Sequence, residues 1–107
     1  MHMNEVLSTL VHEGRHALDV RAGVIPAANP GGAMSLFAEM RAWSSSGNFA
    51  VRNAFSNRHA DYGGLWQYPR ELAINLGTSK EYRKQSRKIL TDAELEEAMG
   101  LFGRHGK

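Results

Sequence analysis

Several absences narrow what this chain can be. It has no cysteine among its 107 residues, which excludes disulfides and thiolate zinc sites. Histidine, aspartate and glutamate are therefore the strong metal ligands that remain. No apolar stretch approaches the roughly 18 residues of a membrane span, and the N-terminus lacks the basic and apolar regions of a signal peptide. The net charge is only +2, so any charged surface for a polyelectrolyte partner must be local.

The residues that are present are ordinary for one small globular domain. Apolar residues make up 42% and charged residues 22%, close to average usage. This length supports one hydrophobic core. We therefore expect residues 1–107 to form a single domain, complete or part of a longer protein. If the protein is exported, a segment outside this chain carries it, and we expect secretion or delivery as part of a larger protein.

Helical periodicity predicts a mainly α fold in a compact small domain, with five or six helices and no confident strand. Residues 4–21 form the best-supported helix, with Asn4 as its N-cap and Gly23 as its stop. Residues 33–43 predict a second helix, which the small residues 44–47 end or bend. Residues 49–55 favour a further helix over a short strand.

The second half of the chain begins with an irregular segment at 57–69, rich in aromatic and ionisable residues, where function often lies. Pro69 predicts the start of a helix that reaches Leu76. A further helix extends to about Leu90, and residues 91–94 form a capping-box sequence that opens the last helix, which fades at Gly103.

The segment His12-Glu13-Gly14-Arg15-His16 reads H-E-x-x-H. On a helix, His12 and His16 project from one face, one turn apart. Two imidazoles can then share one Zn²⁺, and Glu13 lies beside them to reach a bound water. Chance gives such a match in on the order of one in a hundred chains of this composition. Two hydrogen-bonded histidines are the alternative, which we favour less because the helix is apolar and Glu39 is a candidate ligand on the next helix.

Together with Glu39 in Ala38-Glu39-Met40-Arg41-Ala42-Trp43, the motif resembles the gluzincins, zinc peptidases with H-E-x-x-H on one helix and a glutamate ligand on a later one. The resemblance covers residues 7–43. It implies that His12, His16 and Glu39 bind Zn²⁺, with water in the fourth position. It also implies that Glu13 is the general base of peptide-bond hydrolysis, which would make the protein a zinc metallopeptidase.

Short zincin domains of this general kind also occur as C-terminal toxin modules of bacterial secreted proteins. The resemblance therefore also implies a toxin or effector whose substrate is a protein or the peptide part of a cell wall, with an immunity or inhibitor protein as a partner. The chain departs from the family at Trp43, where many gluzincins have an acidic residue that orients a zinc histidine. Larger zincins also place a substrate-binding sheet before the motif, so here a different segment would hold the substrate, or the chain is a fragment.

Several residues compete for the remaining roles. Asp61 is the alternative third ligand to Glu39. Asp19 reads as a solvated helix residue or, less favoured, as a partner that orients an imidazole. An oxyanion donor is also needed, and we select Tyr62 and His59 from a set that also contains two further candidates, Tyr68 and Arg41.

A rival site is a basic stripe with helical spacing, formed by Lys80, Arg83, Lys84, Arg87 and Lys88. It could bind nucleic acid or an acidic partner as part of a non-enzymatic helical module. We favour the interpretation that the stripe is a solvated helix face, because no nucleic-acid motif accompanies it. The opposite side of this helix, with Tyr82 and Leu90, would then pack on the core. A third possibility is a fold in which zinc is only structural.

Overall fold

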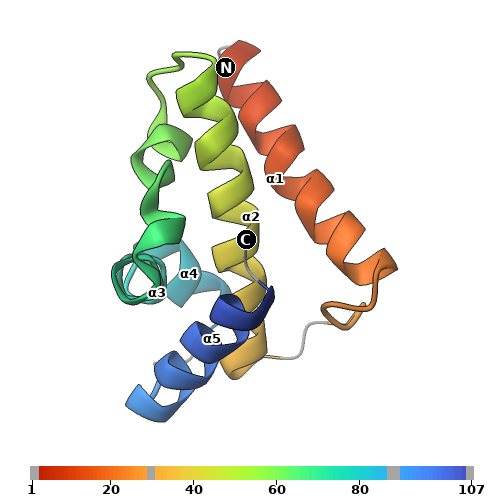
Figure 1. Ribbon diagram of the computed structural model, residues 1–107, viewed down its shortest axis with the longest axis vertical. Helices are drawn as coiled ribbons and strands as arrows, with labels where there is room; N and C mark the ends of the chain where they lie inside the picture. The colour runs from red at the N-terminus through yellow and green to blue at the C-terminus, as the bar shows by residue number, and fades with distance from the viewer. Residues whose placement is uncertain (1–2, 29–30, 87–89, 106–107) are drawn as a thin grey trace.

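The computed structural model describes residues 3–28, 31–86 and 90–105, and all regular structure within these ranges is helical (Figure 1). The mainly α prediction is confirmed. The radius of gyration of 13.0 Å is typical of a compact domain of about 100 residues. Among the described residues, no helix is long and apolar enough to cross a membrane. The elements are α1 (Met3–Arg21), α2 (Gly32–Arg52), the 3-10 helices η1 (Arg58–Tyr62) and η2 (Leu65–Gln67), α3 (Pro69–Gly77), α4 (Lys80–Ser86) and α5 (Asp92–His105).

Helix α2 lies at the centre of the domain. Helix α1 runs along one side of it, η1 and α3 lie on the other side, and α5 crosses near its N-terminal end (Figure 1). Because α2 has neighbours on several sides, its buried residues are not confined to one stripe. The largest fully buried apolar side chains come from α2, α3 and α5: Leu36, Phe37, Met40, Leu72, Leu76 and Phe102.

The expected break at residues 44–47 is wrong, because α2 continues through it to Arg52. The small residues there serve packing instead of ending the helix. A Cβ on Gly47 would lie 2.7 Å from the backbone nitrogen of Gly63 and 2.8 Å from the carbonyl oxygen of His59. Gly47 therefore lets η1 approach the backbone of α2 closely, and this tertiary contact outweighs the low helix propensity of glycine and serine.

The helix boundaries in the second half follow the local signals more closely. Pro69 is the first residue of α3, as predicted. The capping box is confirmed, because the Thr91 hydroxyl accepts from the Glu94 backbone N–H at 3.2 Å while the Glu94 carboxylate accepts from the Thr91 N–H at 3.0 Å. Helix α4 is described as far as Ser86, and the rest of the helix expected up to Leu90 falls mainly on residues 87–89, outside the described ranges.

Helix α1 packs with the opposite face from the one its apolar pattern indicates. Its fully or nearly buried residues are polar, namely Ser8, His12 and Asp19. Its large apolar residues point outward: Met3, Leu7, Leu10, Leu18 and Val20 are 36–69% exposed. Asn4, expected as the N-cap, lies inside the helix. The two histidines of the motif therefore lie on a polar, inward-facing side, whereas Glu13 and Gly14 are exposed. The apolar surroundings that we expected for the motif come from α2, where Trp43 packs on His12.

Candidate metal centre and the adjoining cavity

The structure brings together the three residues expected to bind a metal. The Nε2 atom of His12 lies 3.3 Å from Oε1 of Glu39, and Nε2 of His16 lies 2.9 Å from Oε2 of Glu39. All three residues can offer ligand atoms within 4.8 Å of one another. Two atoms bound to one Zn²⁺ at tetrahedral angles lie roughly 3.3 Å apart. One helical turn of α1 and one residue of α2 therefore supply a donor set of two nitrogens and one oxygen.

Hydrogen bonding also explains these distances, and it controls the ionisation of the cluster. Burial alone would raise the pKa of the Glu39 carboxyl, but the hydrogen bonds from His12 and His16 lower this pKa to about 2. The hydrogen bond to Glu39 raises the pKa of His16, against the opposing effect of burial. Nδ1 of His12 is buried and has no hydrogen-bond partner among the described residues. The donor set thus fits Zn²⁺ in ligand type and spacing, and without a metal it forms a histidine–carboxylate network.

Asp19 has neither of the roles expected for it. Its side chain is buried, and its carboxylate accepts from Nε and Nη2 of Arg41 at 2.7 and 2.9 Å. A longer contact of 3.3 Å joins it to Arg15, one turn earlier. Arg41 also donates to the backbone carbonyl of His105 in α5. Arg41 is therefore not an oxyanion donor. Instead, a buried ion pair ties α1 to α2 beside the cluster.

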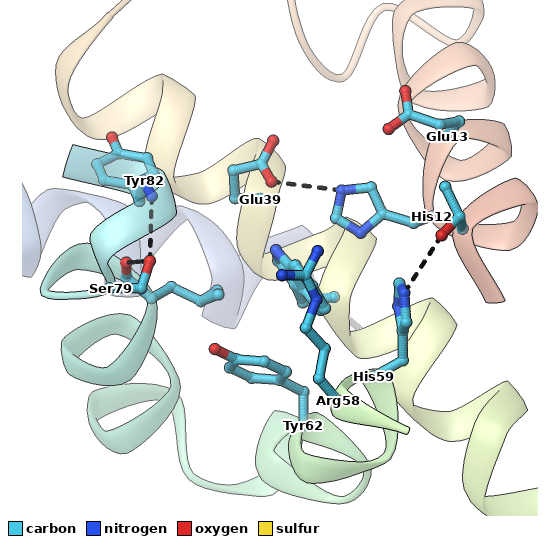
Figure 2. A pocket seen from close by; sticks show the side chains of 11 residues that line it. His12, Glu13, Glu39, Arg58, His59, Tyr62, Ser79 and Tyr82 are labelled. Carbon is cyan, nitrogen blue, oxygen red and sulfur yellow. Dashed lines mark hydrogen bonds and ion pairs between the residues drawn. The ribbon is translucent and has the colours of Figure 1, made fainter. Parts of the chain in front are cut away.

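A cavity of about 140 Å³ adjoins the cluster and contains His12, Glu13 and Glu39 in its wall. Figure 2 shows His12 and Glu13 of α1 on one side of the cavity and Ser79 and Tyr82 on the opposite side. Glu39 of α2 lies between them, and the η1 residues lie below. Glu13 is solvent-exposed, so its carboxylate can reach both the cavity and bulk water. The remaining lining residues are Thr9, Trp43, Arg58, His59, Tyr62, Leu76, Ser79 and Tyr82.

Contacts on two sides hold η1 against this cavity. The Asn57 carboxamide caps η1 by accepting from the Ala60 N–H at 3.2 Å, and it donates to the Ser8 hydroxyl on α1 at 3.1 Å. His59 is buried, with Nδ1 2.9 Å from the Ser46 hydroxyl on α2. The small residues of α2 that looked like a helix end are thus the surface on which η1 docks.

The two expected oxyanion donors, His59 and Tyr62, both line the cavity, but their polar atoms have different surroundings. Nε2 of His59 lies 3.5 Å from both Glu5 and Thr9, and Nδ1 lies beside the Ser46 hydroxyl, so both ring nitrogens already have polar neighbours. Burial lowers the pKa of His59, which favours the neutral imidazole. The ring of Tyr62 packs on Trp43 at 4.7 Å, and its hydroxyl points across the cavity (Figure 2). Of the two, Tyr62 is better placed to donate a hydrogen bond into the cavity.

The remaining candidates lie elsewhere. Asp61 is exposed on η1 and does not join the cluster, and Tyr68 is 58% exposed and is not among the cavity residues. In the rival stripe, the described residues Lys80, Arg83 and Lys84 are exposed. Arg87 and Lys88 lie outside the described ranges. The expectation that the opposite side of α4 packs inward holds for Tyr82, which is buried.

Arg58, Ser79 and Tyr82 are among the cavity residues that were not anticipated from the sequence. Burial raises the pKa of Tyr82 to about 12, and the carboxylates of Glu39 and Glu94 contribute to this shift, so its hydroxyl stays protonated. Arg58 lies over the Trp43 ring, with Cζ 5.3 Å from the ring centroid. The concentration of aromatic and ionisable residues at 57–69 was the available signal for Arg58, but its direction relative to the motif depends on how η1 docks.

Comparisons with known proteins place the chain in no group: no family model, curated protein or solved structure matches it. The resemblance to gluzincins therefore stays a prediction based on H-E-x-x-H and Glu39. The cluster geometry does not by itself identify that family, because hydrogen bonds produce the same distances. A functional conclusion must rest on the chemistry of the cluster and its cavity.

Proposed function

We propose that the chain is a zinc-dependent metallopeptidase in which His12, His16 and Glu39 hold the metal. The observation that supports this most is that both Nε2 atoms face the Glu39 carboxylate at 3.3 and 2.9 Å beside a cavity. Two imidazoles and one carboxylate are a common donor set of catalytic zinc sites. When bound, Zn²⁺ would bring the pKa of water towards about 7 and polarise a substrate carbonyl.

The chain's own residues supply the proton transfers and the positioning. Glu13 follows a proposed ligand directly, and its carboxylate is exposed at the cavity, so it can accept a proton from water and donate it to the leaving amine. The Tyr62 hydroxyl can donate a hydrogen bond to the developing oxyanion, and His59 is the alternative donor. The substrate is a protein or peptide, including the peptide part of a cell wall, and a secreted effector of this type would be controlled by an inhibitor protein.

Zinc analysis tests the metal site directly. We expect wild-type protein to bind one Zn²⁺ per chain and His16→Gln to lose this binding at least 100-fold in affinity. His105→Gln is the matched control, because His105 is exposed on α5 and outside the cluster, and it should bind zinc like wild type. Folded wild-type protein that takes up no zinc would overturn the proposal.

A second variant separates a catalytic site from a structural one. Glu13→Gln should keep the fold and the zinc but lower hydrolysis by about 10²–10⁴-fold, measured by mass spectrometry of a mixed peptide library. Undiminished hydrolysis in Glu13→Gln would exclude Glu13 as the base. Stoichiometric zinc with no cleavage of any peptide by wild-type protein would instead favour a structural metal.

A further inference from the structure

The two histidines of the cluster have different surroundings. Nε2 of His12 lies 3.3 Å from the Glu39 carboxylate (Figure 2), and Nε2 of His16 lies closer to it, at 2.9 Å. The His16 side chain is 23% exposed, whereas that of His12 is 9% exposed. Water can reach the His16 ring, but the orientation of the His12 ring must be set by the protein around it.

The second ring nitrogen of His12 lacks the contact that usually orients a metal ligand. Histidines that bind metals almost always donate from their other ring nitrogen to a carboxylate, a backbone carbonyl or water, which fixes the ring. Nδ1 of His12 is buried and has no such partner among the described residues. A neutral imidazole has one N–H, so this nitrogen carries the proton whenever Nε2 binds a metal. Some other contact must therefore orient the His12 ring.

Aromatic rings contact the His12 imidazole on more than one side. The centroid of the Trp43 ring lies 4.8 Å from that of His12, with the ring planes 75° apart. The His16 ring lies at 4.9 Å and 78°. Separations of about 4.5–7 Å in an edge-to-face arrangement are favourable for aromatic pairs. Because protein interiors are close-packed, a rotated His12 ring would collide with these neighbours or lose contact with them.

Trp43 is itself firmly held. It is 8% exposed and belongs to the hydrophobic core, and the rings of His59 and Tyr62 on η1 pack against it at 4.8 and 4.7 Å. It follows Glu39 by four residues on α2, so the two side chains project from the same face of this helix. One turn of α2 thus supplies both the carboxylate that faces the two histidines and the ring that packs on one of them.

We propose that Trp43 is a positioning residue of the metal centre, and that its indole fixes the His12 imidazole by packing where a hydrogen bond to Nδ1 is missing. Trp43 acts through His12. It keeps Nε2 directed at Glu39 in metal-free protein and at the ion in zinc-loaded protein. The zinc-bound part of this inference rests on the proposed function, and the metal-free part does not.

Nuclear magnetic resonance of metal-free protein tests this role without zinc. We expect cross-relaxation between the ring protons of His12 and Trp43, and an order parameter of the His12 ring near about 0.85, the value of rigid backbone. In Trp43→Leu the order parameter should fall below about 0.6, and Trp43→Phe, which keeps an aromatic ring, should restore it. A mobile His12 ring in wild-type protein would overturn the inference without any variant.

Zinc affinity tests the same role in the metal-bound state. Loss of a group that orients a ligand typically weakens metal binding by about 10–100-fold, and we expect this loss for Trp43→Leu in competition with a chromophoric chelator. Trp43→Phe should stay within about threefold of wild type, because a ring still packs on His12. Phe102→Leu is the matched control. Phe102 is a buried aromatic residue of α5 outside the cluster and its cavity, so this variant should lose stability but bind zinc like wild type.

The outcomes distinguish the positioning role from a general loss of packing and from the proposed function. If folded Trp43→Leu bound zinc as tightly as wild type, the inference would be overturned although the metal site remained. An equal loss of affinity in Phe102→Leu would show that any loss of core packing weakens the site, and it would also overturn the inference. Wild-type protein that bound no zinc, but whose His12 ring was held by Trp43, would remove only the peptidase function.

Discussion

The two faces of α1 differ in a way that reverses the usual rule for a surface helix. The face against α2 is polar and includes Ser8, His12 and Asp19, while the outer face exposes Leu10 and Leu18 at 62% and 54%. An amphipathic helix normally buries its apolar stripe. The difference shows that specific partners, and not the amount of apolar area, hold α1 in place.

Each buried polar residue of α1 has a partner on another element. Ser8 accepts a hydrogen bond from Asn57, His12 faces Glu39, and Asp19 accepts from Arg41. Buried polar groups of this kind contribute stability only while they are paired. We therefore expect the inner face of α1 to be sensitive to single substitutions and to ionisation, and the outer face to be tolerant.

The largest expected effect is from Asp19→Ala. Removing this carboxylate leaves the guanidinium of Arg41, whose side chain is 10% exposed, without its main partner. Breaking one side of a buried ion pair costs about 3–5 kcal/mol. We expect a loss of unfolding free energy of this size in urea denaturation.

A double variant distinguishes the free-energy cost of the unpaired charge from the cost of lost packing. Asp19→Leu combined with Arg41→Met replaces both charges with apolar groups, and such replacements are often neutral or stabilising. The double variant should recover most of the stability lost in Asp19→Ala. If Asp19→Ala alone changed stability by less than about 1 kcal/mol, the inner face would not depend on its ion pair.

The next effect concerns pH in metal-free protein. The folded pKa of Glu39, about 2, lies below its ordinary value of 4.5. Its stabilisation is therefore complete above about pH 4.5 and is lost as the pH falls towards 2, by on the order of 3 kcal/mol. The pKa of His16 lies above its ordinary 6.5, so its contribution is present below pH 6.5 and is lost as the pH rises through its folded pKa.

Bound zinc should offset the loss of stability that His16 causes at alkaline pH. The metal binds neutral imidazoles, so its affinity rises with pH. Thermal unfolding of metal-free and zinc-loaded protein between pH 2 and 9 would measure both profiles. Glu39→Gln is the control. In metal-free protein, this variant should show a smaller fall in unfolding temperature as the pH drops from about 4.5 to 2. If wild type and Glu39→Gln lost the same stability at acid pH, other carboxyl groups would be responsible for that loss.

A smaller effect is expected at two glycines that differ in their surroundings. Gly47→Ala would place a Cβ 2.7 Å from backbone atoms at the junction with η1, and overpacking of this kind costs about 1–3 kcal/mol. Gly14→Ala on the outer side of α1 has no neighbouring atom within 4 Å and should stabilise the helix by about 0.5–1 kcal/mol. Urea denaturation of both variants gives the comparison, and a stabilising Gly47→Ala would contradict the close approach.

Local sequence signals predicted the residues of the cluster better than they predicted its surroundings. The i, i+4 spacing grouped His12 and His16, and the resemblance to gluzincins favoured Glu39 on the following helix over Asp61 as the third residue. The preference of proline for the first helical turn placed Pro69 correctly, and the local capping-box pattern placed the start of α5. In these cases the determining interactions join residues close together in the chain or on two adjacent helices.

The features that were missed depend on contacts distant in the chain. Asp19 and Arg41 are 22 residues apart, and each alone resembles a surface residue. Gly47 reads as a helix breaker until the backbone of His59 and Gly63 is placed against it. The side of α1 that faces inward could not be predicted either, because periodicity reports apolar spacing and not the partners available to polar groups.

The smallest expected effect provides the strictest test of the outer face. Leu10 is 62% exposed, so Leu10→Gln removes few contacts and should change the unfolding free energy by less than about 0.5 kcal/mol. Leu36→Ala, at a fully buried position of α2, is the contrasting variant and should cost about 2–5 kcal/mol. Urea denaturation at several protein concentrations measures both. A loss above 1 kcal/mol in Leu10→Gln would mean that this leucine is covered in solution, and the contrast between the two faces of α1 would then fail, because the outer face would also be a packed surface.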